Sequence, residues 1–134
     1  MRVFPDTNVL ASAFGTRGLC ADVVRLVLQR NELITGEILL GELRATLSRK
    51  FRLLVERVDL IEQFLREFHV EPEPKELSKL KLRDHSDLIV ISTAVAAKAV
   101  ILITGDKELL SLSRIKRGPR ILSLRQFWNV VAQR

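Results

Sequence analysis

Alternation of short apolar segments with longer helical segments is the feature that most constrains how this chain can fold. Runs rich in Val, Ile and Leu have the composition of buried strands, and they lie at 2–5, 32–35, 100–104 and 120–124, with a further short strand expected at the start of 70–76. Between these runs, apolar residues recur with the period of one face of a helix. Strands separated by helices favour a parallel sheet, because a parallel connection needs a crossover. We therefore expect an α/β fold built on a parallel sheet.

The helices predicted from this periodicity lie at 7–14, 20–29, 36–50, 54–68, 87–98, from Asp106 onward and at 123–133. The segment "TRG" at 16–18 separates the first two, and the prolines of 70–76 separate the fourth from the fifth. Ser123 is expected to be the N-cap of the last helix. Aromatic residues make up only 5% of the chain, and the helix at 87–98 is rich in alanine. Small side chains of this kind favour close packing of helices on the sheet.

One apolar run needs a separate interpretation, because it approaches the length of a membrane span. Residues 88–105 carry a single charge, Lys98, and their number is at the lower limit for a spanning helix. A lysine near the middle of a bilayer is costly, and the run changes from alanine-rich to β-branched before it ends at Gly105. We interpret it as a buried helix followed by a buried strand, and we expect no association with a membrane.

The size and composition of the chain favour one domain in a reducing compartment. Its 134 residues, of which 47% are hydrophobic, can bury a substantial core, and we expect residues 1–134 to form a single domain. Cys20 is the only cysteine, so no intramolecular disulfide can form. The predicted strand at 2–5 leaves no room for a secretory signal peptide. We therefore expect a cytoplasmic protein.

The positive charge is concentrated in the C-terminal quarter of the chain. The net charge is +6, and residues 107–134 account for all of it, with seven Lys or Arg residues against one acid, Glu108. A neutral body with a basic end suggests a polyanion as partner, although an ordinary solvated surface gives the same count. The residues that we expect to contact nucleic acid are Arg114, Lys116 and Arg117.

Four acids lie where the predicted fold brings side chains towards one edge of the sheet. Asp6 follows the first strand, and Asp106 follows the strand at 100–104. Asp87 opens the alanine-rich helix, and Glu42 lies between two leucines of the third helix. Ligands bind beyond the carboxyl ends of the strands in open parallel sheets, so acids there form a candidate metal site. Each acid also has a simpler interpretation, since helix N-termini favour Asp87 and Asp106 and Glu42 can be solvated.

Four motifs together resemble those of PIN-domain nucleases, and most closely those of the VapC-like toxin components of toxin–antitoxin pairs. They are "DTNVL" (6–10), "GELRATLSRKF" (41–51), "RDHSDLIVISTA" (83–94) and "LITGDKELL" (102–110), in this order and spacing. The match extends from residue 2 to the closing "ILSLRQF", which is nearly the whole chain. The motif "DTN" alone has low specificity, whereas the four motifs together are specific for the family.

The resemblance implies a three-layer α/β/α sandwich with a parallel sheet of four or five strands. It also implies an endoribonuclease that uses Mg²⁺ or Mn²⁺ and leaves 5′-phosphate and 3′-hydroxyl ends. The catalytic carboxylates that would hold the ion are Asp6, Glu42, Asp87 and Asp106. Thr104 and either Thr7 or Asn8 are implied to support them by hydrogen bonds, and Asp84 resembles an extra acid that is frequent in the family, to which we assign a supporting role. Carboxylates without a cluster of Cys or His favour a hard cation of this kind.

The sequence departs from the family pattern at two places. An aliphatic residue is commoner than proline at position 5, and Pro5 lacks the N–H that a central strand donates. We expect this loss to be absorbed at the last position of the strand, by a bulge if necessary. The segment "DHSD" at 84–87 is less acidic than is common in the family, which bears on whether a second ion is bound.

Other function classes remain open. A phosphatase of the haloacid dehalogenase type also begins with an aspartate at a strand end, but it needs a second aspartate where this chain has Asn8. A degenerate PIN domain can bind RNA or protein without cleaving it, and PIN nucleases of RNA processing share these motifs. The resemblance further implies RNA as substrate, an antitoxin as partner and a homodimer. Phe51, Leu53 and Leu54 are candidates for an interface or for the core.

Overall fold

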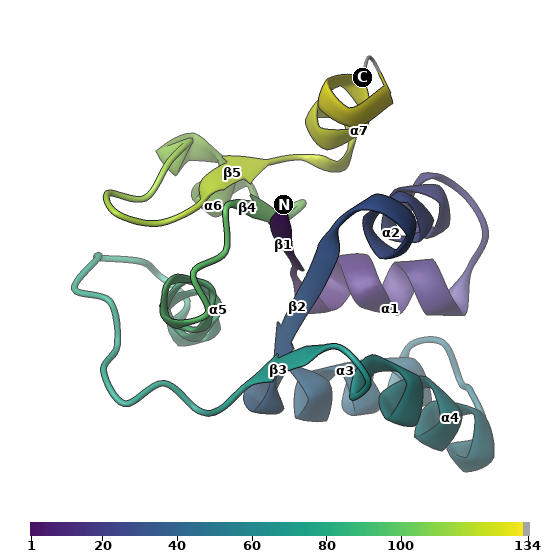
Figure 1. Ribbon diagram of the computed structural model, residues 1–134. Coiled ribbons are helices and arrows are strands. Elements are labelled where there is room, and N and C mark those ends of the chain that lie inside the picture. The colour runs from purple at the N-terminus through teal and green to yellow at the C-terminus, as the bar shows by residue number, and fades with distance from the viewer. Residues whose placement is uncertain (133–134) are drawn as a thin grey trace.

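The computed structural model describes residues 1–132, in which a parallel five-stranded sheet lies between layers of helices (Figure 1). The strands are β1 (Arg2–Pro5), β2 (Glu32–Gly36), β3 (His69–Glu71), β4 (Ile101–Ile103) and β5 (Arg120–Leu122). The helices are α1 (Thr7–Gly15), α2 (Leu19–Arg30), α3 (Glu37–Arg49), α4 (Val55–Leu65), α5 (His85–Ala96), α6 (Lys107–Leu112) and α7 (Leu124–Ala132). The predicted α/β/α sandwich with a parallel sheet is therefore confirmed.

The strand order β3-β2-β1-β4-β5 places β1 at the centre of the sheet, and all the strands are parallel. From β1 the chain moves outward through α1 and α2 to β2, and through α3 and α4 to β3. It then returns through α5 to β4, on the other side of β1, and continues through α6 to β5. The direction of winding thus reverses between β1 and β4. The carboxyl ends of the two strands at such a reversal are the usual place for a ligand site.

Alternate residues of each strand face the two helical layers. Val3 of β1 packs in a core formed with α1, α2, α3, α4 and α7. The next residue, Phe4, packs in a second core formed mainly with α5 and α6. Leu33 and Ile34 of β2 divide in the same way, since side chains of a strand alternate between its faces. Figure 1 shows α5 on one side of the sheet and α1 and α2 on the other.

The helix that carries Asp87 begins earlier than the sequence predicted. It starts at His85, with Asp84 as its N-cap, because the Asp84 carboxylate accepts a hydrogen bond of 2.9 Å from the backbone N–H of Ser86. The segment "DHSD" offers several residues that can cap a helix, and the sequence alone did not indicate which one does so. Asp87 consequently lies in the first turn of α5 rather than at its start.

The predicted end of the fourth helix also differs. The helix predicted at 54–68 ends at Leu65, because the backbone N–H groups of Glu67 and Phe68 turn back to the carbonyls of Phe64 and Leu65 before β3 begins. Ser123 caps α7 as predicted. Its hydroxyl accepts from the Gln126 N–H at 3.1 Å, and the Gln126 side chain accepts from the Ser123 N–H at 2.9 Å. Gln133, the predicted end of this helix, and Arg134 lie outside the described residues.

Pro5 is accommodated at the end of β1 in the way the sequence suggested. The strand pairs with β2 through Arg2 and Val3, and with β4 as far as Pro5 itself. The backbone N–H of Asp6 donates to the carbonyl of Ile103 at 2.9 Å, so the nitrogen of Pro5 faces the β2 side, where the pairing has already ended. Proline therefore costs no hydrogen bond of the ladder at this position.

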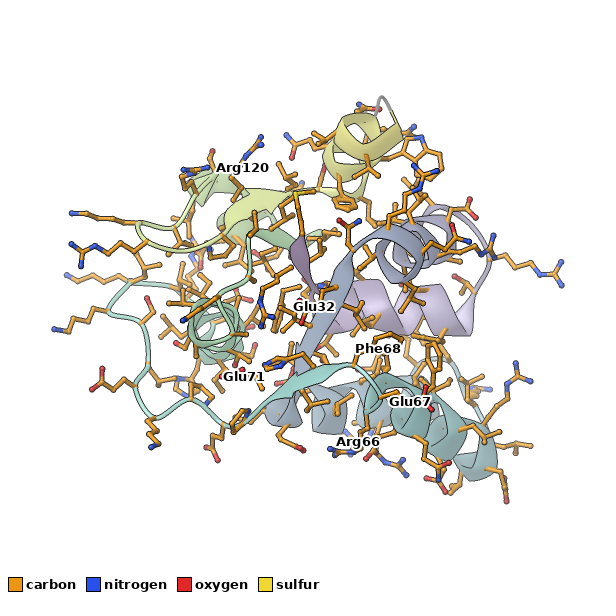
Figure 2. The ribbon with its side chains drawn as sticks, viewed as in Figure 1. Glu32, Arg66, Glu67, Phe68, Glu71 and Arg120 are labelled. Carbon is orange, nitrogen blue, oxygen red and sulfur yellow. The ribbon has the colours of Figure 1, made fainter. Side chains whose placement is uncertain are left out.

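Ion pairs join α3 to α4 on the surface of the molecule. Arg66, which follows α4 and is labelled in Figure 2, donates to both carboxylate oxygens of Glu37 at 2.8 and 3.0 Å. Arg44 of α3 contacts Asp59 at 2.8 Å and Glu62 at 3.0 Å. These pairs are exposed and each is weak, but together they define how α4 lies against α3. Glu42, one of the predicted site residues, lies in α3, so these ion pairs also contact the helix that carries it.

The apolar run at 88–105 contains most of α5 followed by β4, as predicted. Among residues 1–132, none of the helices has both the length and the apolar character that crossing a bilayer requires. Of the apolar residues proposed for an interface, Phe51 and Leu53 are partly buried and pack against the core, whereas Leu54 is 72% exposed.

Candidate functional site

Asp6 is held firmly at the carboxyl end of the central strand. It is 8% exposed, and one carboxylate oxygen accepts from the backbone N–H of Val9 at 2.9 Å, which makes Asp6 the N-cap of α1. The other oxygen accepts from the hydroxyl of Thr104. Burial raises the pKa of Asp6, the bonds from Thr104 and Val9 oppose this rise, and the negative charge of Asp106 adds to it.

Thr104 links the ends of the two strands at the switch point. Its hydroxyl donates to Asp6, while the same oxygen accepts from the backbone N–H of Asp106 at 3.0 Å. The carboxylate of Asp106 in turn accepts from the N–H of Leu109 at 3.0 Å and so caps α6. Asp106 is exposed, whereas Thr104 is fully buried. One buried hydroxyl thus orients the segments that carry two of the four predicted carboxylates.

Asp87 lies in the negative field of the two strand-end acids. Its pKa is raised to about 6, first by burial and then by the charges of Asp106, Asp84, Glu108 and Asp6, in that order. Repulsion between carboxylates acts only over a short distance in water, because water and salt screen it. The first turn of α5 therefore brings Asp87 towards the same edge of the sheet as Asp6 and Asp106.

Glu42 joins this group through Thr7. The hydroxyl of Thr7, the first residue of α1, donates to a carboxylate oxygen of Glu42 at 3.2 Å. Thr7 is buried and Glu42 is partly buried, so the predicted supporting role of Thr7 has a geometric basis. Asn8 is exposed and makes no side-chain hydrogen bond within residues 1–132. Of the two candidates after Asp6, Thr7 is thus the one in contact with a predicted site residue.

The acids around Asp87 have different surroundings. Asp84 is exposed, and the hydroxyl and N–H of Ser86 bond to it and lower its pKa. Glu108, which the sequence analysis did not single out, accepts from the backbone N–H of Arg83 at 3.0 Å and contributes to the field at Asp87. No sequence signal marks Glu108, because it is simply an acid in the first turn of a short helix.

The three residues predicted to contact nucleic acid, Arg114, Lys116 and Arg117, are all exposed. Arg114 lines a pocket with Arg120 and Arg125, which the sequence analysis did not single out. Lys116 lines a different pocket, beside the C-terminal half of α5. Ile115, between Arg114 and Lys116, turns inward and is 9% exposed.

The donor set suits a hard divalent cation, but its members are not gathered into a finished coordination sphere. Among residues 1–132, no three His, Cys, Asp or Glu side chains are grouped so that they could hold a metal ion. Each of Asp6, Asp106 and Glu42 is turned towards a hydrogen-bond donor of the chain. The chemistry of the site fits an oxygen-ligated ion, because carboxylates that raise one another's pKa favour a neutralising charge.

Comparisons with known proteins identify the family and the fold of the chain. The family model described as "PIN domain" matches residues 2–108, a span that includes all four predicted carboxylates. The fold is similar to that of a chain in a crystal structure of VapBC2 from Rickettsia felis bound to a DNA fragment from their promoter. The TM-score is 0.62 and the identity 21%, over 91% of this chain and 97% of that chain. No sequence among the curated proteins matches this chain.

Proposed function

This chain belongs to the PIN domain family, and on that basis we propose that it is a Mg²⁺- or Mn²⁺-dependent endoribonuclease. The observation that carries the proposal is that Asp6 and Asp106 follow the ends of β1 and β4 at the reversal of the sheet, where the hydroxyl of Thr104 contacts the Asp6 carboxylate and the backbone N–H of Asp106. Burial raises the pKa of both Asp6 and Asp87, and the charge of Asp106 adds to each rise, which supports one shared region of negative charge there. A haloacid dehalogenase phosphatase is not favoured, because Asn8 stands where that chemistry needs a second aspartate.

The proposed ligands come from four elements of the fold. Asp6 and Asp106 come from the ends of β1 and β4, and Asp87 comes from the first turn of α5. Glu42 comes from α3 and accepts a hydrogen bond from Thr7, the residue that follows Asp6. When bound, a divalent cation polarises the scissile phosphate and lowers the pKa of a water molecule for attack. The carboxylate side chains would need to turn from their present hydrogen-bond donors to bind the cation together.

The neighbouring residues of the chain position these carboxylates. Thr104 holds Asp6 through its hydroxyl and orients Asp106 through the bond that it accepts from the backbone. The caps of α1 and α6 hold the same two acids. In this scheme Thr7 and Thr104 are positioning residues, whereas Asp84 acts on Asp87 through charge alone.

Substitution of the strand-end acids tests this proposal. Asp6→Asn and Asp106→Asn should lower the rate of RNA cleavage with Mg²⁺ by on the order of 10³-fold, since cation catalysis is worth several kcal/mol. Asparagine caps helices about as well as aspartate, so both variants should retain the melting temperature of the wild type. Cleavage of bulk RNA, followed with and without EDTA, is the measurement.

A matched control is Asp22→Asn, which removes an exposed acid of α2 and should leave cleavage unchanged. Retention of Mg²⁺-dependent cleavage in the Asp6 and Asp106 variants would overturn the assignment of the site. Wild-type protein that binds RNA but never cleaves it would instead favour a non-catalytic PIN domain.

We further propose that the protein acts as the toxin of a toxin–antitoxin pair. The four sequence motifs resemble this branch of the family, and the fold is similar to a chain of a VapBC2 complex. An antitoxin protein is then the expected partner, in addition to RNA and a second copy of the chain. A PIN nuclease of RNA processing is the alternative. Growth arrest on expression, reversed by Asp106→Asn, would separate the toxin from that alternative.

A further inference from the structure

A pocket with three arginines lies beside the candidate site. Its volume is about 570 Å³, and it is bounded by the end of α6, the outer edge of β5 and the first turn of α7. Arg114, Arg120 and Arg125 line it together with Ser123 and other residues. Arg114 and Arg120 are antiparallel bridge partners, so their backbones lie side by side. Figure 2 shows Arg120 at the β5 end of the molecule, opposite Arg66 near α4.

One end of the pocket lies at the same edge of the sheet as the carboxylates, and from there the pocket extends along β5 to Arg120, the first residue of that strand, which pairs with Ile101. The backbone N–H of Thr104 donates to the carbonyl of Leu122 at 3.0 Å, and Thr104 is the residue that holds Asp6. Leu122 lines the pocket, and Ser123 and Arg125 follow it beyond the carboxyl end of β5. Adjacent strands are about 4.8 Å apart, so β5, two places from β1 in the sheet, lies roughly 10 Å from it.

The three guanidinium groups carry charge that the chain does not neutralise. All three residues are exposed, and within residues 1–132 none of them forms an ion pair or donates a side-chain hydrogen bond. At the start of α7, the N–H groups of Ser123 and Gln126 are already satisfied by their reciprocal bonds. The charge that can bind an anion in the pocket is that of the three arginine side chains.

We infer that this pocket binds the backbone phosphates of an RNA strand that leads to the carboxylate edge. The inference rests on the proposed function for the identity of the polyanion. Arginine forks match phosphate oxygens in pairs, and a strand that crosses the carboxyl ends of β1 and β4 and then follows the outer edge of β5 would bring flanking phosphates over Arg125 first and over Arg120 and Arg114 next. The acids at the ends of β1 and β4 repel a polyanion. The arginines beside β5, which is one strand from β4 and two from β1, offset that repulsion.

A small anion or an acidic protein segment would also neutralise the arginines. An RNA backbone is the better match because the pocket runs along β5 to its carboxyl end, from which a single strand can extend to the ends of β4 and β1. Lys116 lines a separate pocket of about 650 Å³ beside α5, so the arginines of this pocket add to the residues that charge spacing indicated.

Binding without cleavage tests the inference. An oligouridylate of about 12 nucleotides, labelled with fluorescein, is titrated in EDTA against the triple variant Arg114→Gln, Arg120→Gln, Arg125→Gln. We expect its affinity to fall by about tenfold or more. We also expect the slope of log K against log salt to become shallower by about 2, because each phosphate contact on a single strand contributes about 0.7. A lower Kd for polyglutamate than for the oligouridylate in the wild type would overturn the inference.

The matched control is Arg17→Gln, Arg49→Gln, Arg57→Gln, which removes three exposed arginines from the α1–α2 loop, α3 and α4. Both triple variants lower the net charge equally, so a loss of affinity confined to the pocket variant supports the site. Equal losses in the two variants, or a wild type that does not bind the oligonucleotide, would overturn it. Mg²⁺-dependent cleavage by the wild type, measured separately, decides the proposed function whichever of these results is found.

Discussion

Asp6 has three roles, and aspartate is the residue type that can fill all three. It ends the central strand, caps α1 through the N–H of Val9, and presents a carboxylate at the switch point. Aspartate and asparagine serve equally as caps, but only aspartate adds charge. Burial raises its pKa, so the charged form costs free energy that a helix cap does not require. A charged Asp6 at this position is explained if the carboxylate binds a cation.

The pKa of Asp87 leads to a prediction about stability. The folded protein holds this proton with a pKa of about 6, against an ordinary value of 3.8. Because the folded state binds the proton more tightly than the unfolded chain, the free energy of unfolding falls as the pH rises through this interval. In EDTA at neutral pH, Asp87→Asn should therefore be more stable than the wild type, by on the order of 1 kcal/mol after discounting for solvent screening.

Denaturant unfolding over a pH series measures this difference, which should shrink as the pH is lowered from about 6 towards 3.8. Added Mg²⁺ should stabilise the wild type and not the variant. The exposed control Asp22→Asn should leave the pH dependence as it is. An Asp87→Asn protein that is less stable than the wild type at neutral pH would show that the carboxylate has a structural role instead.

At the level of elements, the close approach of α5 to β2 brings Asp87 to the site. A Cβ added to Gly36 would lie 2.7 Å from Cγ2 of Thr93 on α5, so no larger residue fits without a shift. The alanine-rich composition of this helix predicted such close packing. The exact start of the helix was not predictable, because Asp84, Ser86 and Asp87 are all plausible caps and only the folded chain selects Asp84.

Gly36→Ala should consequently destabilise the protein by about 1–3 kcal/mol, the usual cost of overpacking. Thr93→Ser removes the clashing methyl group and keeps the hydroxyl, which donates to the carbonyl of Ile89. The double variant should therefore recover much of the loss in a denaturant titration. Equal destabilisation by Gly36→Ala with and without Thr93→Ser would refute this account of the packing.

At the scale of the whole molecule, the positions of the strands and of the acids at their ends could be predicted from the sequence. Val3, Leu33 and Ile101 lie in strands that apolar composition identifies, and parallel pairing follows from the helices between them. The arginine pocket could not be predicted. A turn and a β-bridge next to β5 bring Arg114, Arg120 and Arg125 together, and these form only in the folded chain. Charge counting located the basic segment but not which of its residues share a surface.

The distribution of charge also explains how an acidic site can serve a polyanion. The carboxylates lie at the reversal between β1 and β4, and the arginine pocket lies on the neighbouring edge strand. The net charge of +6 arises entirely from residues 107–134. The acids thus lie at the carboxyl ends of the two inner strands β1 and β4, and the arginines lie along the edge strand β5.

The most direct test of the central claim is the anomalous difference map of a crystal grown with Mn²⁺. We predict a peak beyond the carboxyl ends of β1 and β4, about 2.1–2.2 Å from oxygens of Asp6 and Asp106, with Asp87 and Glu42 turned towards it directly or through water. A peak at another place, or an Asp87 and a Glu42 that remain turned away from an ion bound at this edge, would contradict the claim that the four carboxylates form one metal site.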